Sequence, residues 1–203
     1  HDANDGAPAF LLINDGKGVF SDGTKAAALD KKNRRRTFSC SLVDLDSDRD
    51  QDLVVVSDFA GIDIFLNDGT GKFNDVTDRL GDFRYSFGMS HTLADFNGDG
   101  HVDIVATNWY GQSVSVFLNK DDGSFHVPVQ YAVSRMPKSI VIEDLDADGD
   151  LDFVVSSDFD NSITVLLNNG SGIFTTHWST VVDSQVRNSN SVAAGLIDSD
   201  EHM

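Results

Sequence analysis

The chain has 203 residues and a formal net charge of −18, and its sequence pI is near 4.3. This acidity argues against a nucleic-acid-binding surface, because phosphate backbones attract an excess of Lys and Arg. No run of about 18 apolar residues appears, so we expect no membrane insertion. Cys40 is the single cysteine, which excludes an intrachain disulfide framework and a cysteine-based zinc finger, and we expect it to fill a small space in the core.

The N-terminal segment carries two elements that recur later in the chain. An apolar run over residues 9–14 ends at Asn14, and Gly18-Val19-Phe20 follows it at a fixed distance. We interpret these elements as the third and fourth strands of a partial unit covering residues 1–37. The basic run over residues 31–36 is interpreted as a solvated loop, and it is also the one basic cluster that could line a channel mouth.

Three complete units follow, with predicted boundaries at 38–88, 89–137 and 138–189. Each contains, in order, a first strand, an acidic loop, an apolar second strand, a third strand ending near an Asn, and a Gly-x-Phe turn that starts a fourth strand. The acidic loops at 44–52, 95–103 and 144–152 start 51 and 49 residues apart. A fixed period of about 50 residues with four short strands per unit is typical of β-propeller blades.

The sequence therefore predicts an all-β fold of four-stranded antiparallel blades, forming one domain over residues 1–203. A second partial unit at 190–203 contains an expected first strand, 191–196, and the start of a fourth acidic loop, 196–200. The two partial units could complete each other in a small four-bladed ring. The alternative is that the chain is part of a larger ring of six to eight blades.

The acidic loops predict metal sites, because 13 of the 33 acidic residues lie within these three short windows and such crowding requires a neutralising cation. Calcium takes six to eight oxygen ligands, which closely spaced carboxylates on a tight turn supply. We assign side-chain ligands at loop positions one, three, five and nine, and the backbone carbonyl at position seven. These ligands are Asp44, Asp46, Asp48, Asp50 and Asp52 in the first loop, Asp95, Asn97, Asp99, His101 and Asp103 in the second, and Asp144, Asp146, Asp148, Asp150 and Asp152 in the third.

The loops differ from an EF-hand, which has a bidentate Glu at position twelve and flanking helices. Position twelve is Val55, Ala106 or Val155, inside a β run. Arg49 replaces the turn glycine of the other two loops, and a left-handed backbone there costs about 1 kcal/mol or more. We therefore expect weaker calcium binding, or a distorted turn, at the first loop. The fourth loop has Leu196 at the first ligand position, which makes a site there doubtful.

These motifs resemble a known repeat family. The Asp-x-Asn-Gly-Asp-Gly-x-x-Asp pattern at 95–103 and the Leu-Asn-x-Gly-x-Gly-x-Phe turns at 66–73 and 167–174 look like the FG-GAP/VCBS repeats of integrin α-chain-like propellers. Phe87-Gly88 lies where the Phe-Gly signature of that family would precede a first strand. The resemblance implies seven or eight blades in many relatives, calcium in the loop between the first two strands, and an extracellular or cell-surface location, with a periplasmic one also open.

The sequence contains no nucleophile elbow, catalytic Cys/His pair or phosphate-binding glycine loop. His91 is interpreted as a packed histidine rather than a group lining a channel. Trp109 and Tyr110 follow a second strand, where an aromatic ring could stack on a sugar or pack between blades. We expect a binding or adhesion module for a protein or carbohydrate ligand with structural calcium. The alternative is a catalytic or non-catalytic propeller domain of a secreted carbohydrate-active enzyme such as a polysaccharide lyase.

Overall fold

The computed structural model describes residues 6–32, 34–84, 88–182 and 191–195. Over these residues the secondary structure is β apart from one short 3₁₀ helix, η1 (Thr77–Arg84). The strands form four antiparallel sheets, and in the three larger sheets neighbouring strands are also consecutive in the chain. The all-β prediction is confirmed, and the acidic loops connect strands rather than helices.

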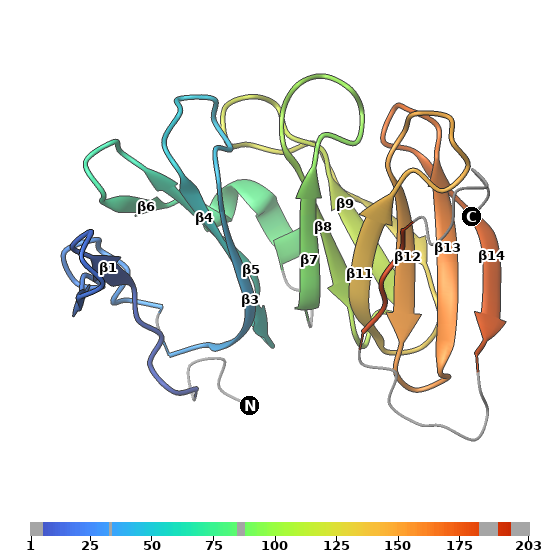
Figure 1. Cartoon of the computed structure of the whole chain (residues 1–203), viewed down its shortest axis with the longest axis horizontal. Coiled ribbons are helices and arrows are strands. Elements are labelled where there is room, and N and C mark those ends of the chain that lie inside the picture. Colours follow the sequence, from blue (N-terminus) through green and yellow to red (C-terminus); the bar gives the residue numbers. More distant parts are fainter. Residues whose placement is uncertain (1–5, 33, 85–87, 183–190, 196–203) are drawn as a thin grey trace.

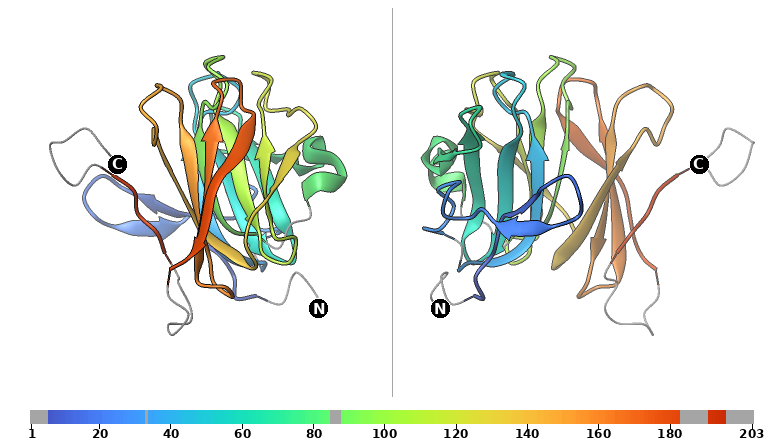
Figure 2. Two further views of the ribbon diagram at one scale, coloured as in Figure 1. Left: turned by 90° about the vertical axis from the view of Figure 1, so that its right-hand side faces the viewer. Right: turned by 60° about the vertical axis from the view of Figure 1, so that its left-hand side comes forward.

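Each complete unit forms one four-stranded blade, and the blades lie side by side (Figures 1 and 2). Blade 1 consists of β3 (Arg36–Val43), β4 (Asp52–Asp58), β5 (Gly61–Asn67) and β6 (Phe73–Asp75). Blade 2 consists of β7 (Gly88–Ala94), β8 (Asp103–Asn108), β9 (Ser113–Phe117) and β10 (Val129–Ala132). Blade 3 consists of β11 (Pro137–Glu143), β12 (Asp152–Ser157), β13 (Ser162–Asn168) and β14 (Phe174–Val181).

The hydrophobic cores lie between the blades, because each central strand presents apolar side chains to both of its faces. Val54 and Ile64 of blade 1 pack with Ile104 and Phe117 of blade 2. Between blades 2 and 3, the ring of Phe96 makes edge-to-face contacts with those of Phe153 and Phe174, at centroid distances of 5.0 and 5.9 Å. Burial of each large side chain stabilises the fold by about 1.5–3 kcal/mol, so contact between blades is a main source of stability.

The N-terminal segment forms a two-stranded sheet of β1 (Leu12–Asn14) and β2 (Phe20–Asp22), as expected for a third and fourth strand. It packs beside blade 1, where Leu11 and Ala27 meet Phe65 and Phe73.

Over the described residues, the C-terminal segment does not add a strand to this sheet. The β1–β2 sheet has two strands, and residues 191–195 have no strand, so the predicted strand at 191–196 is wrong over that range. The fourth acidic loop at 196–200 and Phe87 lie outside the described residues.

Three further expectations require correction. The fourth strand of blade 2 begins at Val129, since Phe125 makes only an isolated bridge to Asn119. Cys40 is exposed rather than buried in the core, because Ser39 and Ser41 face blade 2 and Cys40 lies on the opposite face of the strand, where it lines a cavity. The basic run is not a solvated loop throughout, because Lys32 and Arg35 both pair with the buried carboxylate of Asp63.

Candidate functional site

All three acidic loops lie at the same edge of the blades, between the first and second strands (Figure 1). In each loop the carboxylate at position one accepts the backbone N–H of position six. The three hydrogen bonds run from Arg49 to Asp44 at 3.0 Å, from Gly100 to Asp95 at 2.8 Å, and from Gly149 to Asp144 at 3.0 Å. The first aspartate therefore holds the loop in a tight turn.

The carboxylates at position nine close each loop from below. Asp52, Asp103 and Asp152 have no exposed surface. Each accepts one backbone N–H from position two of its own loop and one from an Asn, which is the last residue of the third strand in blades 1 and 3 and lies two residues beyond it in blade 2. The six distances are 2.8 or 2.9 Å. These residues, which the sequence suggested only as ligands, clamp the loop to the third strand.

Burial raises the pKa of all three of these carboxyl groups. For Asp103 the pKa rises to about 6, with the nearby charges of Asp99 and Asp95 adding to the effect of burial. The ionised form is thus costly without a cation nearby.

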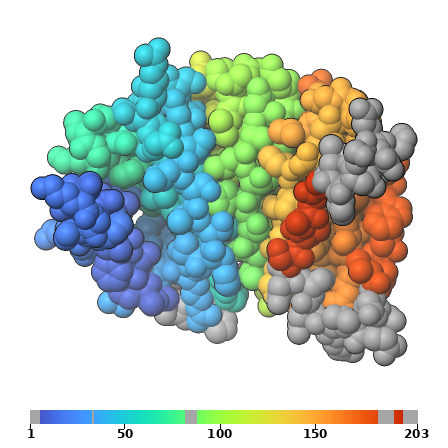
Figure 3. All heavy atoms as spheres, in the orientation of Figure 1, coloured from blue at the N-terminus to red at the C-terminus, as the bar shows by residue number. Residues whose placement is uncertain are grey.

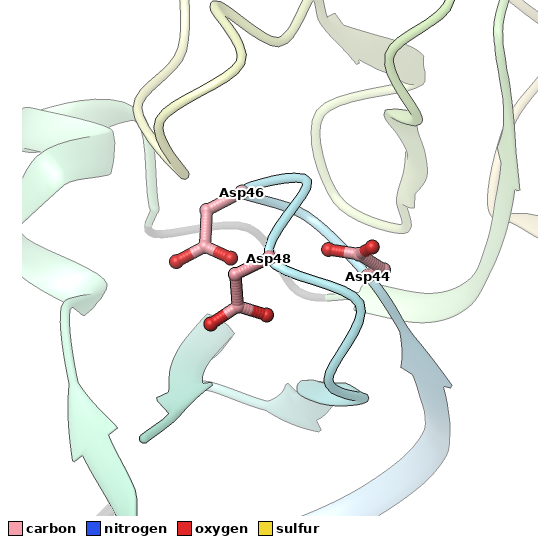
Figure 4. Close-up of side chains that lie close together, drawn as sticks. All are labelled: Asp44, Asp46 and Asp48. Atoms are coloured by element: carbon pink, nitrogen blue, oxygen red, sulfur yellow. The ribbon is translucent and has the colours of Figure 1, made fainter. Parts of the chain in front are cut away.

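The structure gathers three carboxylates into a cluster in each of two loops. Oxygen atoms of Asp44, Asp46 and Asp48 lie within 4.8 Å of one another (Figure 4), and so do oxygens of Asp144, Asp146 and Asp152. Calcium–oxygen distances are about 2.3–2.6 Å, so oxygens with this spacing can share one ion.

The first loop provides the observation that tests whether these carboxylates fit a calcium ion. The Oδ1 atoms of Asp44 and Asp46 are buried and have no hydrogen-bond partner among the described residues. The pKa of Asp46 is raised by burial and by the charge of Asp48. Buried carboxylate oxygens without a donor are suited to a hard cation such as Ca²⁺. The residues of the first and third loops therefore fit the metal.

The second loop has a different arrangement of the same ligand positions. Asp95 accepts N–H groups from Gly98, Asp99 and Gly100. The side-chain amide of Asn97 donates to Asp99 at 2.9 Å. The oxygens of this loop are thus directed at donors of the loop itself, and a bound ion would require the Asn97 amide to turn its oxygen inward.

Position seven has a side-chain role that the sequence prediction, which used only its carbonyl, missed. Carboxylate oxygens of Asp50 and Asp150 lie only 2.8 and 2.6 Å from where a Cβ on Gly69 and Gly170 would sit, so a larger residue at either turn position would require the carboxylate to move. In blade 2 the equivalent turn residue is Asp121, and position seven is His101, whose Nδ1 lies 3.0 Å from the Asp121 carboxylate. Comparing loops and turns together across the repeats would have revealed this exchange.

The backbone of Arg49 is left-handed, with a φ of 76°, as are Gly100 at 88° and Gly149 at 94°. The left-handed backbone expected at Arg49 is therefore confirmed, while the weaker calcium binding stays a prediction. Position four is also left-handed in all three loops, at Ser47, Gly98 and Ala147, which was not anticipated.

Trp109 and Tyr110 lie at the opposite edge of the blades from the acidic loops, between β8 and β9. Trp109 is half-buried with the ammonium of Lys138 over its ring at 5.7 Å, whereas Tyr110 is 61% exposed. In blade 3 the equivalent Phe159 is 54% exposed and stacks with the guanidinium of Arg135 at 4.2 Å. The edge thus presents aromatic rings flanked by cations.

His91 lies between two blades, as expected for a packed histidine. Its two ring nitrogens each lie 2.9 Å from a serine hydroxyl of β3, Ser39 and Ser41. Burial lowers the pKa of His91, so the imidazole joins the inner strands of blades 1 and 2 in its neutral form.

A cavity of about 380 Å³ lies between the N-terminal segment and blade 1, where the surface in Figure 3 is hollowed. Its lining is mainly apolar, and Lys32 and Asp63 are its charged groups. Because Asp63 is 1% exposed and already paired with Lys32 and Arg35, its charge is neutralised within the chain.

A family model of the FG-GAP-like repeat matches residues 44–106, 95–155 and 144–203. Each of the first two matches starts at the first aspartate of an acidic loop and ends in the second strand of the next blade. The chain belongs to the FG-GAP-like repeat family.

This FG-GAP-like repeat chain is similar to parts of two longer proteins. Cartilage acidic protein 1 of Xenopus tropicalis is 49% identical over 49 residues, which cover 24% of this chain and 8% of that protein. A lectin of Agrocybe aegerita, whose structure concerns specific recognition of non-reducing terminal N-acetylglucosamine, has a TM-score of 0.55 and 22% identity over 92% of this chain and 48% of its own. The chain thus spans under half of both, and the lectin supports the fold alone.

A chain of the Photorhabdus luminescens Tc holotoxin pore is also similar, with a TM-score of 0.42 and 18% identity over 75% of this chain and 7% of that one. This similarity is too low to carry an argument. No helix among the described residues is long and apolar enough to cross a membrane.

Proposed function

We propose that this chain is a calcium-stabilised propeller module that binds a protein or glycan ligand outside the cell or at its surface. The observation that carries the proposal is the pair of buried, unpartnered oxygens on Asp44 and Asp46, within a cluster completed by Asp48. The family assignment supports it, since the matched repeats begin at these loops.

The proposed role of calcium is structural. Each ion would join the two strands that flank its loop and offset the repulsion among the carboxylates. Three ions would carry six positive charges and reduce the formal charge of −18 by a third. Extracellular calcium-binding modules have dissociation constants of about 10⁻⁴–10⁻³ M, so millimolar calcium would stabilise the fold by mass action.

Thermal unfolding of the chain in EDTA and in CaCl₂ tests this role. We expect the melting temperature to rise with calcium concentration, and MgCl₂ at equal ionic strength serves as the control for screening. A melting temperature that is the same in EDTA and calcium would overturn the structural role of the ion. Asp46→Ala should remove part of the rise, because it deletes one of the unpartnered oxygens.

The proposed ligand surface is the edge opposite the acidic loops. Tyr110 and Phe159 present exposed rings there, and Trp109 lies beside Tyr110 with Lys138 above it. Aromatic rings of this kind stack on the apolar faces of sugars, and they are also enriched at protein interfaces. The lectin of similar fold recognises terminal N-acetylglucosamine, which makes glycans the first ligands to test.

A glycan array probed with the calcium-loaded chain and with Tyr110→Ala separates the two ligand classes. Signals that Tyr110→Ala abolishes would support a glycan ligand at this edge. An array without signals would favour a protein ligand, and signals that are unchanged in Tyr110→Ala would place the glycan elsewhere on the molecule. Val127→Ala is the matched control, because Val127 is 74% exposed and lies outside this group of aromatic residues.

A further inference from the structure

The acidic loops of neighbouring blades are joined by buried hydrogen bonds. Asn119, two residues beyond β9, donates its side-chain amide to the carbonyl of Leu45 in the first loop, at 2.8 Å. Its backbone N–H donates to the carboxylate of Asp103, the ninth residue of the second loop, at 2.8 Å. Asn119 of blade 2 thus contacts both the first loop, in blade 1, and Asp103, which clamps the second loop in its own blade.

The same connection is repeated one blade further along. The side-chain amide of Asn168 donates to the carbonyl of Phe96 in the second loop at 2.8 Å. Its backbone N–H donates to Asp152 in the third loop, also at 2.8 Å. The repetition shows that these contacts are a property of the repeat rather than an accident of one interface.

Together these hydrogen bonds form one path through all three loops. The path is continuous because the backbone N–H groups of Leu45 and Phe96 donate to Asp52 and Asp103. Its members are almost fully buried: Leu45 is 1% exposed, Phe96 2%, Asn119 1%, Asn168 6%, and the clamp aspartates 0%. Water cannot replace a lost bond at such sites, so a broken link leaves an unpaired polar group.

From this path we infer that calcium binding at one loop strengthens binding at the loop of the adjacent blade, and that Asn119 and Asn168 are the positioning residues that transmit the effect. The inference rests on the proposed calcium function. Asn119 couples the first loop to the second, and Asn168 couples the second to the third.

We expect the coupling between neighbouring calcium sites to be positive because of where the hydrogen-bonded residues lie in the loops. Leu45 and Phe96 lie between the first and third ligand positions, so an ion that fixes those ligands also fixes the carbonyl that receives the Asn amide. The ordered Asn then holds the clamp aspartate of the next loop, and the ordering cost at that loop is reduced before its ion arrives. Repulsion between neighbouring ions would instead weaken binding at the adjacent loop. The measured sign of the coupling therefore decides between the two effects.

The experiment measures calcium affinity at the second loop with the third loop intact or silenced. Asp146→Ala silences the third loop, and it removes an exposed carboxylate. The backbone amide of Gly100, followed by NMR during a CaCl₂ titration, reports on the second loop. Silencing should weaken binding there about 5-fold or more, within the usual range of coupling between sites. In an Asn168→Ala background, silencing should have no effect on the second loop.

Asn67→Ala is the matched control, because within the described part of the chain the side-chain amide of Asn67 donates to the carbonyl of Gln51 in its own blade and to no other blade. It should leave the coupling between the second and third loops unchanged. Asn119→Ala, with Asp46→Ala silencing the first loop, repeats the test at the other interface if Asn168→Ala does not fold. Equal affinities with the third loop intact and silenced, or stronger binding after silencing, would overturn the inference. A Gly100 amide that never responds to calcium would also overturn the inference, whereas the calcium function itself is refuted by a melting temperature that is the same in EDTA and calcium.

Discussion

Asp103→Asn separates the clamp role of the ninth loop position from a role as calcium ligand. The carboxylate accepts backbone N–H groups from Phe96 and Asn119 and has no exposed surface. Asparagine offers one carbonyl oxygen, so one of the two buried N–H groups is left facing an NH₂ group. An unpaired buried donor costs about 1–3 kcal/mol. For a chain of this size, each 1 kcal/mol lowers the melting temperature by about 2–4 °C, which predicts a fall of about 2–12 °C in EDTA.

Asp99→Asn provides the comparison in the same loop. The Asp99 side chain is exposed and its carboxylate accepts N–H groups only from within the loop, so the melting temperature in EDTA should change by less than about 2 °C. In calcium, Asp99→Asn should lose part of the calcium-induced rise. Differential scanning calorimetry of both variants, with and without calcium, gives the four values. If the Asp103→Asn variant and the wild type have the same melting temperature in EDTA, the clamp role of Asp103 is refuted.

Three further predictions concern the loops and the buried ion pairs. Calcium affinity at the second loop should fall as the pH drops through about 6, because the raised pKa of Asp103 makes a proton compete with the ion. The metal-free chain should respond oppositely and gain stability between pH 7 and about 4, since a folded pKa above the ordinary 3.8 means that protonation favours the folded state. Titration calorimetry and urea unfolding across this pH range check both signs. Arg49→Gly should stabilise the metal-free chain by about 1 kcal/mol, because glycine adopts the left-handed backbone without strain. It should also strengthen calcium binding at the first loop. Urea unfolding measures the stability and calorimetry the affinity, and a variant less stable than the wild type would contradict the reasoning. Arg35→Ala should destabilise the fold by up to about 3–5 kcal/mol, the cost of removing one partner of a buried charge, although Lys32 remains paired with Asp63 and limits the loss. Lys31→Ala is the control, because Lys31 is exposed. Similar melting temperatures for the two variants would argue against a stabilising Arg35–Asp63 pair.

The period of the sequence predicted most of the fold because each repeat contains its own strands and turns. The strands around the loops, such as β4 and β12, follow directly from an apolar run bounded by acidic and turn residues. The fourth strand of blade 2 was misplaced because Pro128, which has no backbone N–H to donate, interrupts the pairing that begins at Phe125 in the equivalent position. The other copies have no proline at this position, so the break does not appear in the repeat pattern.

The ligand positions were predictable from spacing, whereas the contacts between loops were not. Asp50 and His101 occupy the same loop position, but their different partners become visible only when the neighbouring turns are in view. The same holds for Lys32 and Arg35, whose charges looked solvated until Asp63, about 30 residues away, was found buried beside them. Charge runs in a sequence do not reveal which member finds a buried partner.

Within each acidic loop the carboxylates have two distinct tasks, and this division bears on how calcium can act. The first and ninth aspartates accept backbone N–H groups, so they give the loop its shape before any ion binds. The carboxylates at positions one, three and five lie close together in the first loop, and the Oδ1 atoms of Asp44 and Asp46 have no hydrogen-bond partner among the described residues, so these three carboxylates carry most of the repulsion. A loop that is already shaped loses little conformational freedom on binding, and relief of repulsion then contributes directly to affinity. Calcium would therefore stabilise an existing fold rather than create it, and the metal-free chain should retain its strands while melting at a lower temperature.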